Sequence, residues 1–347
     1  HLPDDAVVLV DENLVGDPTV QFLAPRLHDP TPFELWRLPL RAPRPTAIFL
    51  EGDATDSVSA VARRYPNAVV ARLASPYGGP TLLNEIRVSA DQVAAPMGTY
   101  LTETAPGATI GPSLRRPDVS LPEVQPAHAY PVRARWTGAL LAPEFGDYVF
   151  RLAGPASALA TLDQRRTVPE GRDALLTLAR GLHSMEIDAT LDGDVPVQLL
   201  WKPPGSRDFA PVPHDALFTD PVSSNGLLGR YYPNGTWTSP VAYEQVDPIV
   251  SFRYHLLPLP PPFSIEWTGT LIAPLDGVYA IGTTSIDTSR VAIDGRPVVD
   301  NTTPNLYVEG RVALGRGPHD VRVRYEAHTG FNHVELYWQP PGQDRQP

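Results

Sequence analysis

The segment WTGALLAP at residues 136–143 returns as WTGTLIAP at residues 267–274, and this repeat decides the fold. The offset between the two segments, 267 minus 136, is 131 residues. A period this long is typical of whole domains in tandem, since solenoid repeats are only about 20 to 45 residues long. We therefore compared the two halves of the chain outward from this segment.

The match extends well beyond the central segment. The same offset maps the following residues onto one another: Tyr100 onto Tyr231, Pro117 onto Pro248, Tyr148 onto Tyr279 and Asp163 onto Asp294. After a small insertion, Gly181–His183 matches Gly317–His319, and residues 199–205 match residues 336–342. The sequence therefore predicts two copies of one domain, at about residues 96–220 and 225–343.

Each copy has the pattern of a β domain. Residues 278–283, 321–325 and 334–338 alternate or run apolar over the length of a strand. Turn dipeptides separate these runs, at Asp192-Gly193, Asn234-Gly235, Asp276-Gly277 and Asp294-Gly295. Many short strands with frequent turns predict a sandwich or barrel.

The first 95 residues have a different pattern. Short apolar strands are expected at residues 6–10, 46–50, 68–73 and 82–88, with helices at residues 19–27 and 56–65. This alternation predicts a small α/β layer domain. Asp11-Glu12-Asn13 follows the first strand in place of a glycine-rich turn, so we expect no dinucleotide site.

Length and composition agree with this division. The chain has 347 residues, 41 of them proline, and so much proline favours an all-β body with long loops. We predict a mainly β protein with a small α/β domain at residues 1–95, a degenerate sandwich at 96–222 and a second sandwich at 223–347. Because the chain begins at His1 without a signal peptide, we expect a processed product or an excised fragment.

Charge and residue usage exclude several classes of function. The net charge of −11 disfavours nucleic acid and anionic membranes as general partners. The absence of cysteine excludes disulfides, thiol catalysis and cysteinyl metal sites. We found no G-x-S-x-G elbow, no phosphate-binding Gly-Lys-Ser/Thr loop and no pair of carboxylates placed for acid–base work, so we predict no catalytic site.

Both copies resemble the PA-14 domain, which is named after a segment of a protective-antigen toxin and occurs in adhesins, glycosidases and glycosyltransferases. In the second copy the resemblance is carried by the following residues: 229–232, 247–248, 267–269, 273–274, 277–279, 293–295 and 338–342. The first copy matches chiefly at residues 136–148, 181–183 and 201–205. The resemblance implies two tandem β-sandwiches and, in many members, carbohydrate binding.

The N-terminal third resembles, less specifically, the soluble segment that follows the membrane helices of polyprenyl-phosphate-sugar glycosyltransferases, the protein-mannosyltransferase-like enzymes of the GT-C class. The similar features are residues 2–8, Tyr65-Pro66 and the Gly78-Gly79 turn. The resemblance implies an extracytoplasmic C-terminal part of such an enzyme, with the membrane-embedded remainder of the same polypeptide as a partner.

Sugar-binding members of the PA-14 family hold calcium with two adjacent aspartates joined by a cis peptide, and the calcium binds sugar hydroxyls. In this chain the corresponding residues of the second copy are Ser285-Ile286-Asp287, and those of the first copy are Gly154–Ser157, which include no carboxylate. Since calcium takes six or more oxygen ligands, loss of a carboxylate weakens the site. We therefore expect no metal and no other cofactor.

Five residues of the second copy are candidates for carbohydrate binding. Asp287 and Asp294 are considered as a polar pair, although Asp294-Gly295 also has the sequence of an ordinary hairpin turn. The resemblance places Asn332 near a sugar-contacting position, and it also fits an ordinary loop asparagine. Trp237 and Tyr307, with Tyr243 and Phe331, are expected in loops and could cover the apolar face of a sugar.

The recurring aromatic and histidine residues have a different interpretation. Trp136, Trp201, Trp267 and Trp338 lie on predicted strands in both copies, and we expect them in the cores. His183 and His319 recur at one strand entrance and are expected to be structural, and His328 with His333 does not have the spacing of a metal site. Asn234 and Asn301 each begin a glycosylation sequon, a pattern that is common by chance.

Three hypotheses of function follow. The first is a non-catalytic extracytoplasmic module, at the cell surface, in the periplasm or secreted, that binds a glycan or a partner beside a membrane glycosyltransferase. The second is a structural cell-surface or adhesion protein whose sandwiches act as spacers or self-associate. The third is a fragment of a glycoside hydrolase, which the absence of a catalytic domain disfavours.

Overall fold

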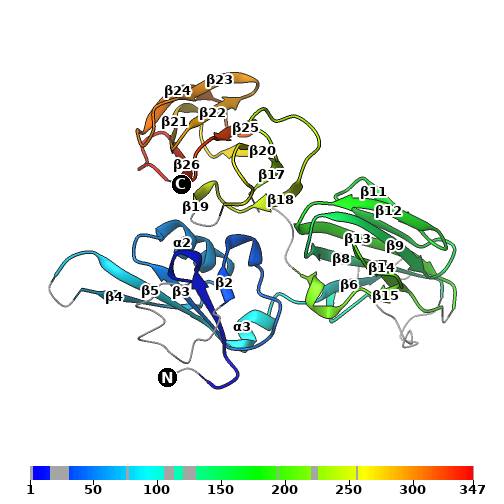
Figure 1. The fold of residues 1–347 in the computed structure, drawn as a ribbon. Helices are drawn as coiled ribbons and strands as arrows, with labels where there is room; N and C mark the ends of the chain where they lie inside the picture. The colour runs from blue at the N-terminus through cyan, green and yellow to red at the C-terminus, as the bar shows by residue number, and fades with distance from the viewer. Residues whose placement is uncertain are drawn as a thin grey trace. The chain divides into compact units, whose positions relative to one another are not determined.

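The computed structural model describes residues 3–15, 31–75, 78–104, 113–119, 130–193, 195–219, 226–254 and 257–346. These residues form five β-sheets and a few short helices, so the predicted mainly β fold is confirmed (Figure 1). The chain divides into two compact units, His1–Gln92 together with Gly226–Pro347, and Val93–Asn225. None of the helices in these described ranges has both the length and the apolar character needed to cross a membrane.

The N-terminal part of the first unit is built on a five-stranded sheet of order β2-β1-β3-β5-β4. Its strands are β1 (Val7–Asp11), β2 (Thr31–Phe33), β3 (Thr46–Glu51), β4 (Val69–Ala74) and β5 (Thr81–Val88). The strand β1 is parallel to its neighbours β2 and β3, and the later pairs are antiparallel. The four strands predicted in this part are therefore confirmed.

The helices of this part are short. They are α2 (Thr55–Arg64) and α3 (Ala90–Ala94), with 3-10 turns at Glu12–Leu14 and Leu35–Arg37. Val58 and Val61 of α2 are buried, as is Ile48 of the central strand β3, so an apolar stripe of the helix covers the sheet. The helix predicted at residues 56–65 is confirmed, whereas the one predicted at residues 19–27 lies outside the described residues.

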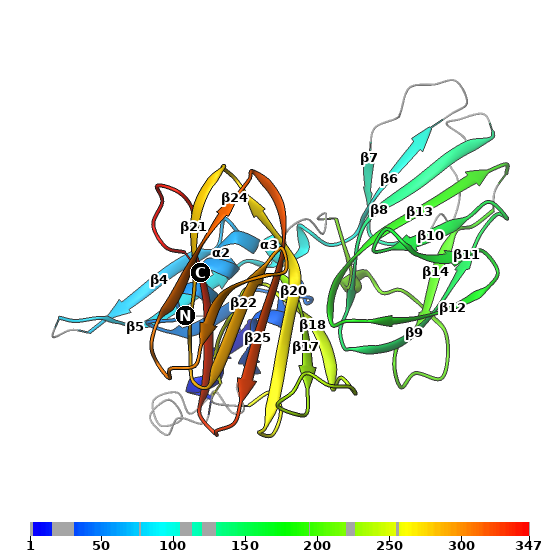
Figure 2. The same ribbon diagram turned by 90° about the horizontal axis from the view of Figure 1, so that it is seen from above.

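The rest of the first unit is a sandwich of two antiparallel sheets. The larger sheet has the order β18-β17-β20-β25-β22-β23, and its neighbouring strands lie side by side in Figure 2. Its strands are β17 (Leu227–Tyr232), β18 (Tyr243–Asp247), β20 (Phe263–Ala273), β22 (Thr288–Ile293), β23 (Arg296–Asn301) and β25 (Gly317–Ala327). The smaller sheet has the order β19-β26-β21-β24, with strands β19 (Ser251–Tyr254), β21 (Gly277–Ser285), β24 (Val308–Leu314) and β26 (Asn332–Gln339).

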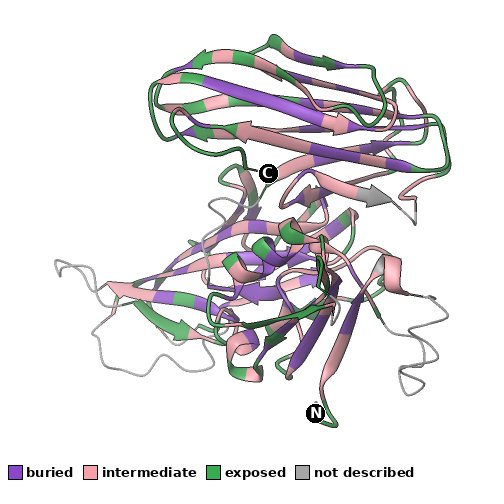
Figure 3. Ribbon diagram, turned by 90° about the vertical axis from the view of Figure 1, so that its left-hand side faces the viewer, coloured by how far each residue is buried: buried purple, intermediate pink, exposed green. Residues whose placement is uncertain are grey.

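Alternating side chains of the two sheets form the core of this sandwich. Buried and exposed residues alternate along its strands, as Figure 3 shows by colour. Trp267, Tyr279 and Tyr325 are fully buried, and the half-buried Trp338 stacks on Tyr279 with ring centroids 5.8 Å apart. The core positions predicted for Trp267 and Trp338 are therefore confirmed.

The outer face of the larger sheet carries a row of charges. One residue of each strand occupies this row, in the order Glu244, Arg230, Glu266, Arg324, Arg290 and Asp300. Arg230 pairs with Glu244 at 2.8 Å, and Arg324 pairs with Glu266 at 2.7 Å. Each of these arginines therefore has a carboxylate beside it, and we call this row the charge ladder.

A buried cluster of polar side chains lies beside β18. The carboxylate of Asp247 is 2% exposed and accepts hydrogen bonds from Tyr231 Oη at 2.8 Å, Trp267 Nε1 at 2.7 Å and Gln245 Nε2 at 2.6 Å. A buried carboxylate is tolerated only with such partners. Asp247 therefore fixes three side chains of the larger sheet at once.

The second unit contains a sandwich whose larger sheet repeats the strand order of the first. Its smaller sheet differs in one edge strand, which follows its partner strand in the chain and does not precede it. Its larger sheet has the order β11-β10-β13-β8-β6-β7, with β16 also on β8, and its smaller sheet has the order β12-β9-β14-β15. The strands are β6 (Thr99–Thr104), β7 (Ser113–Arg116), β8 (Val132–Ala142), β9 (Gly146–Ala153), β10 (Leu159–Leu162), β11 (Arg166–Pro169), β12 (Asp173–Leu178), β13 (Gly181–Leu191), β14 (Gln198–Lys202), β15 (Ala210–Pro211) and β16 (Leu217–Phe218). A 3-10 turn at His214–Ala216 precedes β16.

Local details also recur in both sandwiches. Tyr148 Oη donates to the carbonyl of Glu144 at 2.9 Å, and Tyr279 Oη donates to the carbonyl of Leu275 at 2.7 Å. Trp136 and Trp201 are buried, as predicted. The indole nitrogen of Trp136, however, has no hydrogen-bond partner within the described part of the chain, whereas that of Trp267 has Asp247.

One match made from the sequence is wrong by three residues. Thr137 of β8 pairs with Tyr100, whereas Thr268 of β20 pairs with Leu228. Tyr100 is therefore the counterpart of Leu228 and not of Tyr231. The offset is 128 in this strand, 228 minus 100, and it returns to 131 at Pro117 and Pro248, so the loop after the first strand differs in length by three residues.

Candidate functional site

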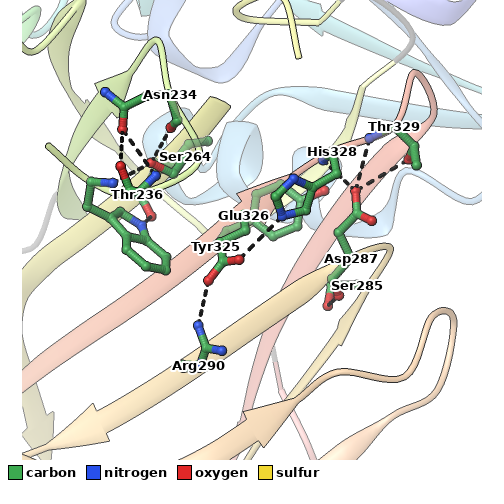
Figure 4. A network of polar contacts seen from close by, with 12 residues as sticks. Asn234, Thr236, Ser264, Ser285, Asp287, Arg290, Tyr325, Glu326, His328 and Thr329 are labelled. Atoms are coloured by element: carbon green, nitrogen blue, oxygen red, sulfur yellow. Dashed lines mark hydrogen bonds and ion pairs between the residues drawn. The ribbon is translucent and has the colours of Figure 1, made fainter. Parts of the chain in front are cut away.

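Three loops meet at one end of the C-terminal sandwich, and we call this end the loop face (Figure 4). They are residues 233–242 between β17 and β18, residues 286–287 between β21 and β22, and residues 328–331 between β25 and β26. The side chain of His328 packs against Gly235, where an added Cβ would lie 3.3 Å from His328 Cε1. The first and third loops are therefore in contact.

Asp287 links the second loop to the third. Its Oδ2 accepts hydrogen bonds from His328 N at 2.8 Å, from Thr329 N at 3.3 Å and from Thr329 Oγ1 at 3.3 Å. Asp287 has a positive φ of 63°, a conformation that aspartate tolerates better than most residues. Its carboxylate thus holds the backbone of the third loop in place.

Asn332 supports the same loop from inside the sandwich. The side chain is buried, its Oδ1 accepts from Tyr325 Oη at 2.8 Å, and its Nδ2 donates to the carbonyl of Thr329 at 2.5 Å. Burial, together with the nearby charge of Asp287, raises the pKa of Tyr325, so its hydroxyl remains a donor. The structure brings Asn332 close to Asp287, with its amide engaged inside the protein.

Phe331 is the most exposed aromatic side chain of the loop face, with 76% of its surface accessible. The hydroxyl of Thr329 donates to the carbonyl of Phe331 at 3.2 Å, in addition to its bond with Asp287. A large apolar ring held in water by an ordered loop is a feature of recognition surfaces.

Charged and polar side chains also lie at this end of β22 and β25. His328 Nε2 donates to Glu326 Oε2 at 3.3 Å, and Arg290 Nη1 donates to Glu326 Oε1 at 2.6 Å. The side chain of His328 is half exposed. The loop that carries the exposed ring of Phe331 therefore also carries the half-exposed side chain of His328.

Trp237 lies in the first loop, as predicted, but its ring is engaged. Its Nε1 donates to the carbonyl of Ile265 at 3.1 Å, and the guanidinium of Arg324 lies 4.9 Å from the ring centroid. The backbone of this loop is held by Ser264, which accepts from Trp237 N and donates to the carbonyl of Asn234. Trp237 thus packs at the edge of the charge ladder.

The structure does not bring Asp294 to Asp287. Asp287 precedes β22 and Asp294 follows it, so the whole length of the strand separates them. Asp294 and Gly295 have φ angles of 49° and 75°, the geometry of the hairpin turn that the sequence also allowed. The polar pair proposed from the sequence is therefore not formed.

Asp294 instead pairs with His319 at the opposite end of the sandwich. His319 Nδ1 donates to Asp294 Oδ2 at 2.7 Å, and its Nε2 donates to the carbonyl of Gly315 at 2.7 Å. In the other sandwich, His183 contacts Asp163 and the carbonyl of Ala179, each at 2.8 Å. The structural role predicted for both histidines is confirmed.

We expect this pair to make stability depend on pH. The carbonyl of Gly315 and then the carboxylate of Asp294 raise the pKa of His319, and the hydrogen bond from His319 lowers the pKa of Asp294. The stabilisation is complete below the pKa of an unfolded histidine, about 6.5, and is lost as the pH rises through the higher folded pKa. On the acid side it is lost as the pH falls through the lowered pKa of Asp294.

The variant His319→Gln tests this expectation. Between about pH 6 and 8 the urea midpoint of the wild type should fall more steeply than that of the variant, because the other histidines are common to both. Tryptophan fluorescence of the full chain reports the transition. Parallel curves for the two proteins would contradict the assignment.

Tyr307 lies in the loop between β23 and β24, at the same end of the sandwich but outside the three loops of the loop face. Its ring packs on the backbone of Gly282 and against Tyr337, with ring centroids 5.9 Å apart, and the guanidinium of Arg345 covers it at 4.3 Å. Tyr243, which was also expected in a loop, belongs to β18 and stacks on Tyr231. These two aromatic residues therefore serve packing in this structure.

The residues at the loop face do not fit a calcium ion. Calcium takes six or more oxygen ligands, usually with several carboxylates. Here Ile286 stands beside Asp287, and one oxygen of Asp287 already accepts three hydrogen bonds. In the described ranges no three acidic or histidine side chains come together in a metal-binding arrangement.

Comparison with known proteins finds a match for the C-terminal sandwich. Residues 223–347 match the family model of the PA14 domain. We call this matching region, which contains the loop face, the charge ladder and the Asp247 cluster, the PA14 sandwich. No curated protein matches the chain.

Several solved structures are similar to the chain. An anti-sigma factor domain-containing protein from Clostridium clariflavum has 18% identity and a TM-score of 0.33, over 72% of this chain and 96% of its own. The PA14 sugar-binding domain from an RTX adhesin has 15% identity and a TM-score of 0.31, over 36% and 94%. The epithelial adhesin 9 A domain from Candida glabrata, in complex with Galβ1-4GlcNAc, has 12% identity and a TM-score of 0.30, over 37% and 88%.

Sequence reasoning missed three residues of the loop face. Thr329, Glu326 and Arg290 were not among the candidates, yet Thr329 bonds to Asp287, and Glu326 joins Arg290 to His328. The signal that was present is the Thr329-Gly330 dipeptide between two predicted strands, directly before the exposed Phe331. The pairing of Arg290 with Glu326 depends on the register of β22 and β25, which the sequence alone does not give.

Proposed function

We propose that the PA14 sandwich binds carbohydrate at its loop face and that the chain is a non-catalytic recognition module. The observation that carries this proposal is the exposed ring of Phe331, held by an ordered loop beside the carboxylate of Asp287. A flat aromatic ring covers the apolar face of a pyranose, and polar groups at its edge bind the hydroxyls. The match of residues 223–347 to the PA14 domain supports this assignment.

The polar residues have separate roles in this proposal. The half-exposed His328 and the hydroxyl of Thr329 bind sugar hydroxyls, while Asp287 and Asn332 hold the loop that presents them. Binding requires no calcium, since the residues at this place do not supply the oxygen ligands that it takes. We expect a shallow contact and weak binding, of the order of millimolar to micromolar.

A glycan array followed by titration calorimetry of the full chain tests the proposal. For a glycan that binds, Phe331→Ala should lower the affinity about tenfold, which corresponds to about 1.4 kcal/mol. Asp287→Ala should also weaken binding, because the backbone at residues 328–329 loses its anchor. Chelation of divalent cations should leave the affinity of the wild type unchanged.

Val278→Ala is the matched control. Val278 is 55% exposed on the smaller sheet, distant along β21 from Asp287, so its truncation removes a similar apolar surface outside the loop face. Equal effects of the two alanine variants would contradict the assignment of Phe331. Binding that disappears with chelation would overturn the calcium-free mechanism.

A structural role is the second candidate, and the engagement of the polar residues favours it. The side chains of Asn332, Trp237 and Tyr307 are packed or hydrogen-bonded inside the protein. In this alternative the sandwiches are spacers of a cell-surface protein, or they self-associate. An array without any hit, with and without calcium, would favour this candidate.

The wider context is also a proposal. We infer that residues 96–222 are a second, degenerate PA14-like sandwich, which the shared strand order of the larger sheets and the repeated His–Asp pairs support. The division into residues 1–95, 96–222 and 223–347 stays a prediction, as do the extracytoplasmic location and the link to a membrane glycosyltransferase. A full-length reading frame that encodes several apolar spans of about 20 residues would support the last of these.

A further inference from the structure

In the sandwich of the second unit, a short strand covers the end of β8. Leu217 and Phe218 of β16 pair with Leu140 and Ala139, just beyond the point where β6 ends its pairing at Thr137. Leu217 and Phe218 are both fully buried. The backbone nitrogen of Gly98 donates to the carbonyl of Leu217 at 2.7 Å, so β16 is held on both sides.

Among the described residues of the PA14 sandwich, no such strand lies at the corresponding place. The strand β17 ends its pairing with β20 at Thr268, and beyond it no strand pairs with β20 on that side among the residues that the structure describes. The sequence there is nevertheless almost the same, with Leu271-Ile272-Ala273-Pro274 matching Leu140-Leu141-Ala142-Pro143. The strand edge from Thr270 to Ala273 is therefore apolar and open, and we call it the β20 edge.

Exposure at the two edges differs sharply. Leu141 is 5% exposed, whereas its counterpart Ile272 is 63% exposed. Ala139 is buried, and its counterpart Thr270 is exposed. An open strand edge with an exposed apolar side chain is normally covered or protected by charge, because its free N–H and C=O groups pair readily with another strand.

We propose that the β20 edge binds an extended polypeptide strand that carries two adjacent large apolar residues, in the manner of β16 on β8. The register of β16 defines what such a strand must supply. Its first apolar side chain lies beside Leu271 and points toward the core, and its second lies beside Thr270 on the outer face and covers Ile272. Main-chain hydrogen bonds to β20 supply the rest of the binding energy.

The second unit itself contains the kind of strand that would occupy the β20 edge. The chain holds one such strand in the equivalent site, and Gly226 repeats the positive φ of Gly98 beside it, 112° against 104°. The sequence of β16 is Leu-Phe, preceded by a 3-10 turn at His214–Ala216. A peptide of residues 212–219, Val-Pro-His-Asp-Ala-Leu-Phe-Thr, therefore contains the turn and both apolar residues.

Fluorescence polarisation of this labelled peptide, titrated with the full chain, tests the proposal. Binding should saturate, and Ile272→Lys should weaken it at least about tenfold, since the lysine places a charge in the covered surface. Val278→Lys is the matched control, because Val278 is similarly exposed on the other sheet, and it should leave the affinity within about twofold. A peptide with aspartate in place of both Leu217 and Phe218 should not bind.

Hydrogen exchange separates the remaining outcomes. Bound peptide should protect residues 269–273 of β20, whereas loss of protection at Leu217 and Phe218 without protection of β20 would mean that it replaces β16 in the other sandwich and would overturn the proposal. Equal binding by both lysine variants would also overturn it. A dimer of the chain that Ile272→Lys dissociates would show that the occupant is a second copy, contrary to the strand proposed. Sugar is absent from these experiments, so failure of the glycan proposal leaves this test intact.

Discussion

Replacement of Asp247 by alanine should lower the free energy of unfolding of the PA14 sandwich by about 3 kcal/mol, more than any surface substitution. The carboxylate accepts from a tyrosine, a tryptophan and a glutamine side chain, and all three donors would lose it together inside the larger sheet. A buried donor that loses its acceptor costs about 1–3 kcal/mol. We expect Asp247→Asn to be destabilising as well, because its amide would oppose the amide of Gln245.

Hydrogen-exchange mass spectrometry of the full chain measures this effect within the sandwich alone. Protection of β17, β20 and β25 should fall in Asp247→Ala by a factor that corresponds to the lost free energy. Asp300→Ala is the control, since Asp300 pairs with Arg290 on the surface and such ion pairs contribute little to the free energy of unfolding. Unchanged protection in Asp247→Ala would show that the cluster adds nothing to stability.

A matched comparison uses the two tryptophans. Trp267→Phe leaves Asp247 without one donor, whereas Trp136→Phe removes an indole nitrogen that has no partner among the described residues. Trp267→Phe should therefore lower the free energy of unfolding by about 1–3 kcal/mol more than Trp136→Phe does. Because both substitutions remove the same part of a buried ring, the difference between them measures the hydrogen bond. Equal losses in the two sandwiches would contradict this interpretation.

Replacement of Gly310 by alanine should have the second largest effect, also about 3 kcal/mol. An added Cβ at Gly310 would lie 1.9 Å from the carbonyl oxygen of Val298, so the backbones of β24 and β23 would have to separate. The oxygen that it meets belongs to the main chain of β23, so no flexible side chain can move aside to relieve the contact.

Gly315→Ala is the control for this prediction. The nearest atom to its added Cβ is Asp276 Oδ1 at 3.7 Å, an ordinary van der Waals distance. Thermal unfolding of the full chain should show a lowered transition for Gly310→Ala and a change within about 1 kcal/mol for Gly315→Ala. A Gly310→Ala protein with the wild-type transition would mean that β23 and β24 separate at little cost.

The fold could be predicted in large part from the sequence because its signals are local. Strand periodicity, turn dipeptides and the repeated WTG segment each depend on a few neighbouring residues. The helix at residues 56–65 ended at Pro66 as expected, and the two recurring histidines were assigned correctly to structure. Even the wrong match of Tyr100 arose from a loop-length difference that leaves the strand pattern intact.

The candidate site was harder to predict because it depends on which side chains face each other across strands and loops. Asp287 and Asp294 are seven residues apart in sequence, but one extended strand carries them to opposite ends of the sandwich. Asn332 and Tyr307 look like polar and aromatic loop residues, yet burial and packing engage both. Exposure of Phe331 follows from the support of its loop by Asp287, which no spacing in the sequence reveals.

The charge ladder limits how this sandwich can meet other surfaces. A flat partner laid over that sheet would strip water from Arg230, Arg324 and Arg290 and their carboxylates, and its own groups would have to replace that hydration. Two copies of this sheet are therefore not expected to stack through this face, even where the protein is concentrated. Encounters are directed instead to the rims of the sandwich, where the loops stay accessible.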